Sequence, residues 1–145
     1  MKKTLLIFLL FLQTVISFSQ ELNIYGYDPE MRDYTVFLGK LNAESADSTS
    51  IWNTEGQYGD KKSHLSIWNA SGAYGSATSD YSPFNEDADY PPQITDEENN
   101  RYGYFTTDIN RRQRCTFDLA DVICKYHLQI SVNIQRWYNL IFGKE

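Results

Sequence analysis

The acidic side chains between Ser63 and Asn100 are the first candidates for chemistry, because this segment contains no Lys or Arg. Its seven acids are Asp80, Glu86, Asp87, Asp89, Asp96, Glu97 and Glu98. Two carboxylates at a suitable separation can hydrolyse a glycosidic bond, so one hypothesis is a small secreted hydrolase using the carboxylates of residues 80–98. Because Ca²⁺ binds six to eight oxygen ligands, a second hypothesis is a calcium site. Its ligands would be Asp80, Glu86, Asp87 and Asp89, although their spacing matches no EF-hand loop. A solvated acidic surface is the third reading.

The chain has two cysteines, Cys115 and Cys124, and two distant histidines, His64 and His127. A disulfide is plausible for an exported protein. Within one helix the cysteines would lie about 13 Å apart along the axis, whereas a disulfide needs Cα atoms within about 7 Å. Pairing therefore requires Cys115 to precede the helix. The spacing does not suit zinc, and no nucleophile, metalloprotease or nucleotide-binding fingerprint is present. The sequence thus predicts a protein that is not an enzyme and needs no cofactor.

A unit of 16 residues occurs three times between Asp47 and Pro92. Its first part reads Ser50-Ile51-Trp52-Asn53, Ser66-Ile67-Trp68-Asn69 and Ser82-Pro83-Phe84-Asn85. Its second part reads Gly56, Tyr58 and Gly59, then Gly72, Tyr74 and Gly75, and finally Ala88, Tyr90 and Pro91. Short repeats of this kind bury their apolar residues by stacking on one another. We therefore expect an ordered segment packed on the rest of the domain.

The residue types predict how each unit is built. Ser can cap a short turn, and Asn can make a side-chain turn. The paired glycines are expected to supply positive φ. Large aromatics usually form the core. The alternative is an exposed platform that stacks on sugars or peptides. Its candidate binding residues are Trp52, Tyr58, Trp68, Tyr74 and Tyr90.

The segment Phe37-Leu38-Gly39-Lys40-Leu41-Asn42, followed by Asp47-Ser48 and the repeats, resembles a family of small secreted bacterial proteins. In that family, S-x-x-N-x-x-G-x-Y-G repeats precede a Pro-rich exit and a Y-G-Y-F-T strand. The matching residues here are Tyr90-Pro91-Pro92 and Tyr102-Gly103-Tyr104-Phe105-Thr106, so the resemblance covers residues 36–107. This chain departs from the family at Thr54-Glu55 and Ala70-Ser71, because in the family an aromatic residue often follows the repeat Asn. The resemblance implies a domain but no activity and no catalytic residue.

The elements that would position these residues follow from local patterns. Residues 34–38 read as a strand ended by Gly39. Residues 93–95 and 102–107 read as a hairpin. A helix is predicted over residues 117–126, capped by Thr116, with residues 128–142 equally consistent with a strand or a continued helix. The fold class is therefore α+β, with a small antiparallel sheet, the repeat segment packed on it and a C-terminal helix.

Residues 1–19 have the composition of a signal peptide, with Lys2 and Lys3 before an apolar run and Ser17-Phe18-Ser19 at the cleavage site. An uncleaved anchor is the alternative.

Residues 20–145 would form one globular domain with no membrane span. Removing two lysines leaves 11 basic against 19 acidic residues, a net charge of −8, which argues against a nucleic-acid partner. We expect a secreted or periplasmic, non-catalytic interaction module. Its partner would be an envelope protein or a polysaccharide, and carbohydrate binding by the repeat aromatics is the alternative.

Overall fold

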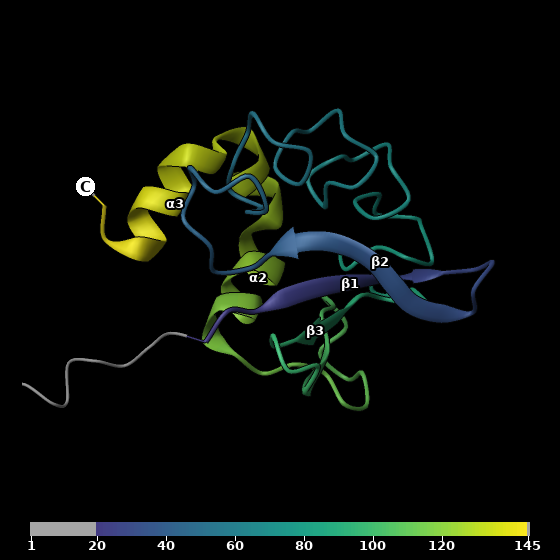
Figure 1. Ribbon diagram of the computed structural model, residues 1–145. Helices are drawn as coiled ribbons and strands as arrows, with labels where there is room; N and C mark the ends of the chain where they lie inside the picture. The colour runs from purple at the N-terminus through teal and green to yellow at the C-terminus, as the bar shows by residue number, and fades with distance from the viewer. Residues whose placement is uncertain (1–19, 145) are drawn as a thin grey trace, which may run out of the picture.

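The computed structural model describes residues 20–144, and the predicted signal peptide lies outside the described residues. The elements in chain order are β1 (Asn23–Asp28), β2 (Asp33–Lys40), β3 (Gln93–Thr95), β4 (Arg101–Tyr104), α2 (Asp118–Val132) and α3 (Ile134–Phe142). The strands form one antiparallel sheet in the order β2-β1-β3-β4. The predicted α+β class is therefore confirmed. Figure 1 shows the repeat segment above the β1–β2 hairpin and both helices toward one end of it.

One face of the sheet forms the core. Ile24, Leu38 and Ile94 are fully buried there, and successive residues of a strand point to opposite faces. The sequence pattern does not predict β1, because its few apolar residues gave no clear alternation. The expected strand end at Gly39 is wrong, since β2 continues to Lys40. Gly39 has φ 105° and lies in a register shift of the β1–β2 ladder, so it makes a bulge rather than an end.

The repeat segment is a coil of successive tight turns without regular strands or helices. Along one unit, backbone N–H groups donate to the carbonyl three residues earlier, except that the N–H of Asp60 donates to the carbonyl four residues earlier. The donors are Ser50, Asn53, Gly56, Asp60, Ser63 and Ser66. The steps of three, three, four, three and three residues complete one 16-residue unit. The same set of bonds then recurs from Ser66 to Ser82. We call residues 47–92 the turn coil.

Side chains hold each unit of the turn coil as the residue types predict. The hydroxyls of Ser50, Ser66 and Ser82 each accept a bond of 3.1 Å from the N–H two residues later. Each repeat Asn also accepts a bond from the N–H two residues later, at Glu55, Ser71 and Asp87. Its amide donates across the unit to the carbonyls of Asp47, Ser63 and Ser79. Every unit thus satisfies much of its own backbone.

The repeat glycines serve close packing and not positive φ, so that expectation is wrong. Only Gly39, Gly103 and Gly143 have positive φ among the described glycines. A Cβ on Gly59 would lie 2.0 Å from the Asn53 carbonyl oxygen, and one on Gly75 would lie 2.3 Å from that of Asn69. The backbone therefore passes too close to itself for any side chain. Pro91 occupies the third equivalent position and cannot donate an N–H, and the turn coil ends there.

The turn coil packs on the core through two aromatic rows. Trp52, Trp68 and Phe84 are 0%, 3% and 8% exposed and follow one another at ring distances of 5.8 and 6.0 Å. The indole of Trp68 donates to the carbonyl of Ile51 in the preceding unit at 2.7 Å. These rings are core, which confirms the expectation for large aromatics. Trp52 and Trp68 present almost no exposed ring surface to a ligand, and Trp68 lines only a small hollow of about 130 Å³.

The second row, Tyr58, Tyr74 and Tyr90, follows the β1–β2 hairpin from its open end toward its turn. Tyr58 packs on Gly39 and Phe37, and Tyr74 lies over Gly26. The hydroxyl of Tyr74 donates to the Tyr27 carbonyl at 3.1 Å. Tyr90 stacks on Tyr27 at 4.3 Å and remains 41% exposed. Tyr58 and Tyr74 therefore attach the turn coil to the sheet, and Tyr90 alone presents a largely exposed ring.

The C-terminal segment is a helical hairpin. The strand alternative for residues 128–142 is wrong: of the alternating apolar residues, Ile130 and Ile134 are buried, whereas Leu128 and Val132 are 68% and 80% exposed. That four-residue spacing is helical. Thr116 does not cap α2, because the N-cap is Phe117, without a side-chain bond. Asn133 separates the helices and caps α3 by accepting from the Arg136 N–H. Among residues 20–144, no helix has the length and apolar character needed to cross a membrane.

Candidate functional site

The face of the sheet opposite the core brings together side chains from three strands. Thr95 of β3 is paired with Asn23 of β1 on one side and with Arg101 of β4 on the other. A second row consists of Tyr25, Gln93 and Tyr104, two residues along β1 and β3 and three along β4, where the β3–β4 ladder has a register shift. Adjacent strands are about 4.8 Å apart, so each row is compact although its members are distant in sequence. We call this surface the open face.

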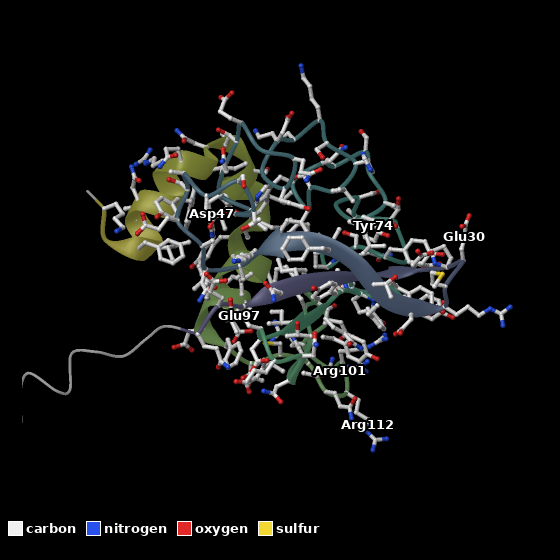
Figure 2. All side chains as sticks on the ribbon, viewed as in Figure 1. Glu30, Asp47, Tyr74, Glu97, Arg101 and Arg112 are labelled. Carbon is white, nitrogen blue, oxygen red and sulfur yellow. The ribbon has the colours of Figure 1, made fainter. Side chains whose placement is uncertain are left out.

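A groove of about 390 Å³ crosses the open face. Its lining residues are Tyr25, Tyr34, Thr35, Gln93, Thr95, Asn99 and Arg101. A second hollow of about 530 Å³ shares Gln93 and Arg101 with it and continues along β4 to Gln113 and Arg114. Figure 2 shows Arg101 and Arg112 on the side of the sheet away from the turn coil, which carries Tyr74. The two hollows therefore adjoin on a surface to which the turn coil contributes no lining residue.

Two buried polar atoms of the open face have no hydrogen-bond partner among the described residues. They are Oδ1 of Asn23 and Oγ1 of Thr95. Thr95 is only 7% exposed and lines the groove, and Asn23 lies directly opposite it in the β1–β3 ladder. An unsatisfied buried polar atom costs about 1–3 kcal/mol. Such groups therefore point to a partner that the folded chain does not itself provide.

Tyrosines surround the groove at the turn of the β1–β2 hairpin. Tyr27 stacks on both Tyr81 and Tyr90 with interplanar angles of 8° and 15°. Tyr34 packs against Tyr27 and Tyr104. Burial raises the pKa of Tyr34 above its ordinary value, and its interaction with Tyr104 raises it further. Its phenol is therefore neutral at physiological pH and able to donate a hydrogen bond.

Arg111 fixes the chain that leaves the turn coil next to these tyrosines. Its guanidinium donates to the carbonyls of Ala88 and Asp89 at 3.0 and 2.7 Å. The same group lies 4.8 Å from the centre of the Tyr104 ring, a cation–π distance. Arg111 thus joins the last turns of the turn coil to Tyr104 through contacts outside the groove itself.

The lining of the open face consists of polar, aromatic and basic side chains. Neither hollow is lined by a carboxylate, a histidine or a cysteine. The charged lining residues are Arg101 and Arg114, and Arg114 is bonded to Asp121 at 2.6 Å. Arg101 has no ion pair within residues 20–144. The groove therefore offers one free positive charge, several amide and hydroxyl groups, and aromatic rings.

The acids predicted to form a calcium site are not gathered by the fold. Asp80, Glu86, Asp87 and Asp89 are all exposed, and no group of three or more His, Cys, Asp or Glu within residues 20–144 could hold a metal ion. The carboxylates of 80–98 also line neither hollow of the open face. Within residues 20–144 these acids form no group that could hold a metal ion, and their exposed positions agree with a solvated surface.

Asp96 is the exception among these acids, because it is 1% exposed. Its carboxylate accepts from Gln20, Glu98, Tyr102 and both the backbone and the side chain of Asn100, at 2.7–2.9 Å. Burial would raise the pKa of Asp96, but these hydrogen bonds outweigh it and hold the pKa below its ordinary value. A carboxylate with its oxygens so fully engaged organises the β3–β4 turn and is not free to react.

Cys115 and Cys124 are both buried free thiols. Burial raises the pKa of Cys115 and raises that of Cys124 to about 12. Neither thiol is therefore ionised at neutral pH, which excludes a ready nucleophile. Cys115 does precede α2, as pairing would require, and a disulfide under oxidising conditions stays a prediction.

Comparisons of the chain with protein-family models, with curated proteins and with solved structures give no match. The functional assignment therefore depends on the geometry of the chain's own residues. Of the predicted binding residues, Tyr90 alone lies exposed beside the open face. Sequence reasoning missed Asn23, Tyr25, Thr95 and Arg101. In the structure, partly buried Asn23, Tyr25 and Tyr27 alternate with buried Ile24 and Gly26, but a glycine at a buried position gives no apolar signal in the sequence.

Proposed function

We propose that this chain is an exported, non-catalytic interaction module that binds carbohydrate on the open face of its sheet. The observation that carries the proposal is Thr95 Oγ1, a buried hydroxyl without a protein partner in a groove lined by tyrosines. Sugars present hydroxyl groups that satisfy such atoms and apolar ring faces that pack on aromatic rings. Pockets of a few hundred Å³ with a few convergent polar groups are typical of small-ligand sites.

In this proposal carbohydrate binds to residues of the strands and not to the repeat aromatics that the sequence suggested. Trp52 and Trp68 are buried, and Tyr58 and Tyr74 are engaged in attaching the turn coil. Tyr25 and Tyr34 take their place, because they line the groove. Export is supported by the signal-peptide composition of residues 1–19.

A pull-down of the mature chain, residues 20–145, tests the proposal. The polymers are cellulose, chitin, xylan, pectin and peptidoglycan, each with and without Ca²⁺. We expect retention on at least one polymer, unchanged by Ca²⁺ and without release of soluble sugar. The combined change Tyr25→Ala and Arg101→Glu should abolish retention. Lys61→Ala with Lys62→Ala, on the exposed turn coil, is the matched control. Failure to bind any polymer, or equal loss in the control, would contradict the proposal.

A further inference from the structure

Building on the proposed function, we propose that the open-face groove is specific for saccharides that carry a carboxylate, such as uronic acids. In this arrangement Arg101 binds the carboxylate. Thr95 Oγ1 accepts a hydrogen bond from a hydroxyl group of the sugar. The paired residues Thr95 and Arg101 thus recognise two different functional groups of one ligand.

The charge of the groove favours an anion. Arg101 is the one charged residue among the seven that line it, and within residues 20–144 it has no ion-pair partner. Arg pairs with carboxylates through two parallel hydrogen bonds. The remainder of the mature chain is acidic, so an anionic ligand is repelled elsewhere and directed to this groove.

The length of the groove suits a saccharide rather than a simple anion. Arg101 of β4 and Tyr34 of β2 both line it and lie on the two outer strands of the sheet, so their backbones are about 14 Å apart. A small anion on Arg101 cannot span that distance to Tyr34. A short oligosaccharide can pack a ring on Tyr34 while its carboxylate reaches Arg101.

The aromatic lining is compatible with an anionic sugar. Tyr25 and Tyr34 line the groove beside the polar row. Burial and contact with Tyr104 raise the pKa of Tyr34, so its phenol remains uncharged and does not repel a carboxylate. Gln93 is 8% exposed and lines both hollows, which leaves its amide to select among sugar hydroxyls.

Calorimetric titration with matched ligands tests the specificity. The ligands are an oligogalacturonate, its methyl ester, which has the same rings without the charge, and an oligomannuronate as a second acid. We expect at least one of the acids to bind ten-fold or more tightly than the ester. Equal affinity for acid and ester would overturn the inference. Retention on neutral polymers alone, with no binding of either acid, would also overturn it but would leave the proposed function standing. Binding of no saccharide at all would reject both.

Two substitutions locate the groups that act. Arg101→Gln should remove the preference for acid over ester while leaving ester binding in place, whereas Arg112→Gln, at an exposed site outside the groove, should change nothing.

Thr95→Val should weaken binding at least ten-fold without lowering the melting temperature, because valine removes a hydroxyl that has no protein partner. Thr54→Val on the exposed turn coil is its control. Unchanged binding with a lower melting temperature would show that the hydroxyl serves the fold and would overturn its role. If Thr95→Val does not fold, the Arg101 pair decides.

Discussion

Asp96 shows how a single residue can look catalytic in sequence and be structural in the fold. It lies in the acidic segment, yet all its hydrogen-bonding capacity is used by neighbours within the β3–β4 turn and by Gln20. Because the folded chain lowers its pKa, the ionised form stabilises the fold. The turn that presents Asn99 and Arg101 to the groove therefore depends on this carboxylate.

The sign of the shift sets a pH dependence. A carboxyl group whose pKa is lower in the folded chain than in the unfolded chain stabilises the fold at pH values above its unfolded pKa, which is near 4. This contribution is lost as the pH falls through the folded pKa. We expect Asp96→Asn to lower stability at pH 7, with the difference from wild type shrinking below about pH 4. Urea unfolding from pH 7 to pH 2.5 measures this. Glu98→Gln, at an exposed neighbour, should show no such trend. A pH-independent difference would contradict the role of the charge.

Gly75 gives a second test at the residue scale. Its backbone lies so close to Asn69 and Ile67 that an added Cβ would overlap carbonyl oxygens at 2.3 and 2.6 Å. We expect Gly75→Ala to cost about 3 kcal/mol in the free energy of unfolding, near the upper end for overpacking. Gly56→Ala is the matched control, because its Cβ would be 3.3 Å from its nearest neighbours, and it should cost less than about 1 kcal/mol. Similar losses would point to backbone flexibility instead.

These residues also show the reach of sequence reasoning. The Ser and Asn turns were predictable, because each bond joins residues at most a few positions apart. The role of the glycines was not, because close approach of Gly59 to Asn53 depends on the path of several consecutive turns. Residue propensity predicts that glycine is favoured at these positions. Only the path of the backbone shows whether glycine is needed for close packing or for positive φ.

At the scale of elements, the helical hairpin shows how a pattern can fit two structures. The apolar residues at 128, 130, 132 and 134 alternate as in a strand, but those at 130, 134 and 138 also follow a helical face. The structure resolves this through burial, because Ile130, Ile134 and Tyr138 are buried together. The exposed Leu128 and Val132 are what made the pattern ambiguous.

A matched pair of substitutions tests that assignment. Ile130→Ala should cost about 3 kcal/mol, because it removes methyl groups from a fully buried position. Val132→Ala should stay within about 0.5 kcal/mol, as is usual for surface changes. Chemical unfolding of both variants measures the contrast. Comparable losses at the two positions would favour the strand alternative.

At the scale of the whole molecule, the turn coil and the sheet are held together by tyrosines over glycines. Tyr74 covers Gly26 of β1 and donates to the carbonyl of Tyr27. A ring packed over a strand glycine supplies the contacts that the glycine lacks. Without such rings the turn coil would meet the sheet mainly through the tryptophan row and the end of β2.

Replacing Tyr74 tests this attachment. We expect Tyr74→Ala to lower the free energy of unfolding by about 3 kcal/mol, since it opens a cavity above Gly26. Tyr74→Phe should cost about 1 kcal/mol, the usual value of one hydrogen bond. Urea unfolding followed by Trp fluorescence measures this, because two of the three tryptophans, Trp52 and Trp68, lie in the turn coil. Full stability of the alanine variant, together with weaker carbohydrate binding, would return Tyr74 to the list of binding residues.

The fold class was predictable because strands, repeat and helix each leave a local pattern. The open face was not, because its row joins Asn23, Thr95 and Arg101 through strand pairing across some seventy residues. The β1 strand carries the first of these residues, and its glycine and scattered apolar residues conceal it. Long-range pairing of this kind has no signature within any one segment.

The tyrosine row also limits how long the turn coil can be. Successive units place their Tyr on the hairpin at Gly39, then at Gly26, then at Tyr27 beside the hairpin turn. A fourth unit would extend past the end of the β1–β2 hairpin and leave its Tyr without a strand beneath it. Relatives with more units should therefore have a hairpin lengthened in proportion, and those with fewer should have a shorter one. The two segments would have to gain or lose length together in evolution.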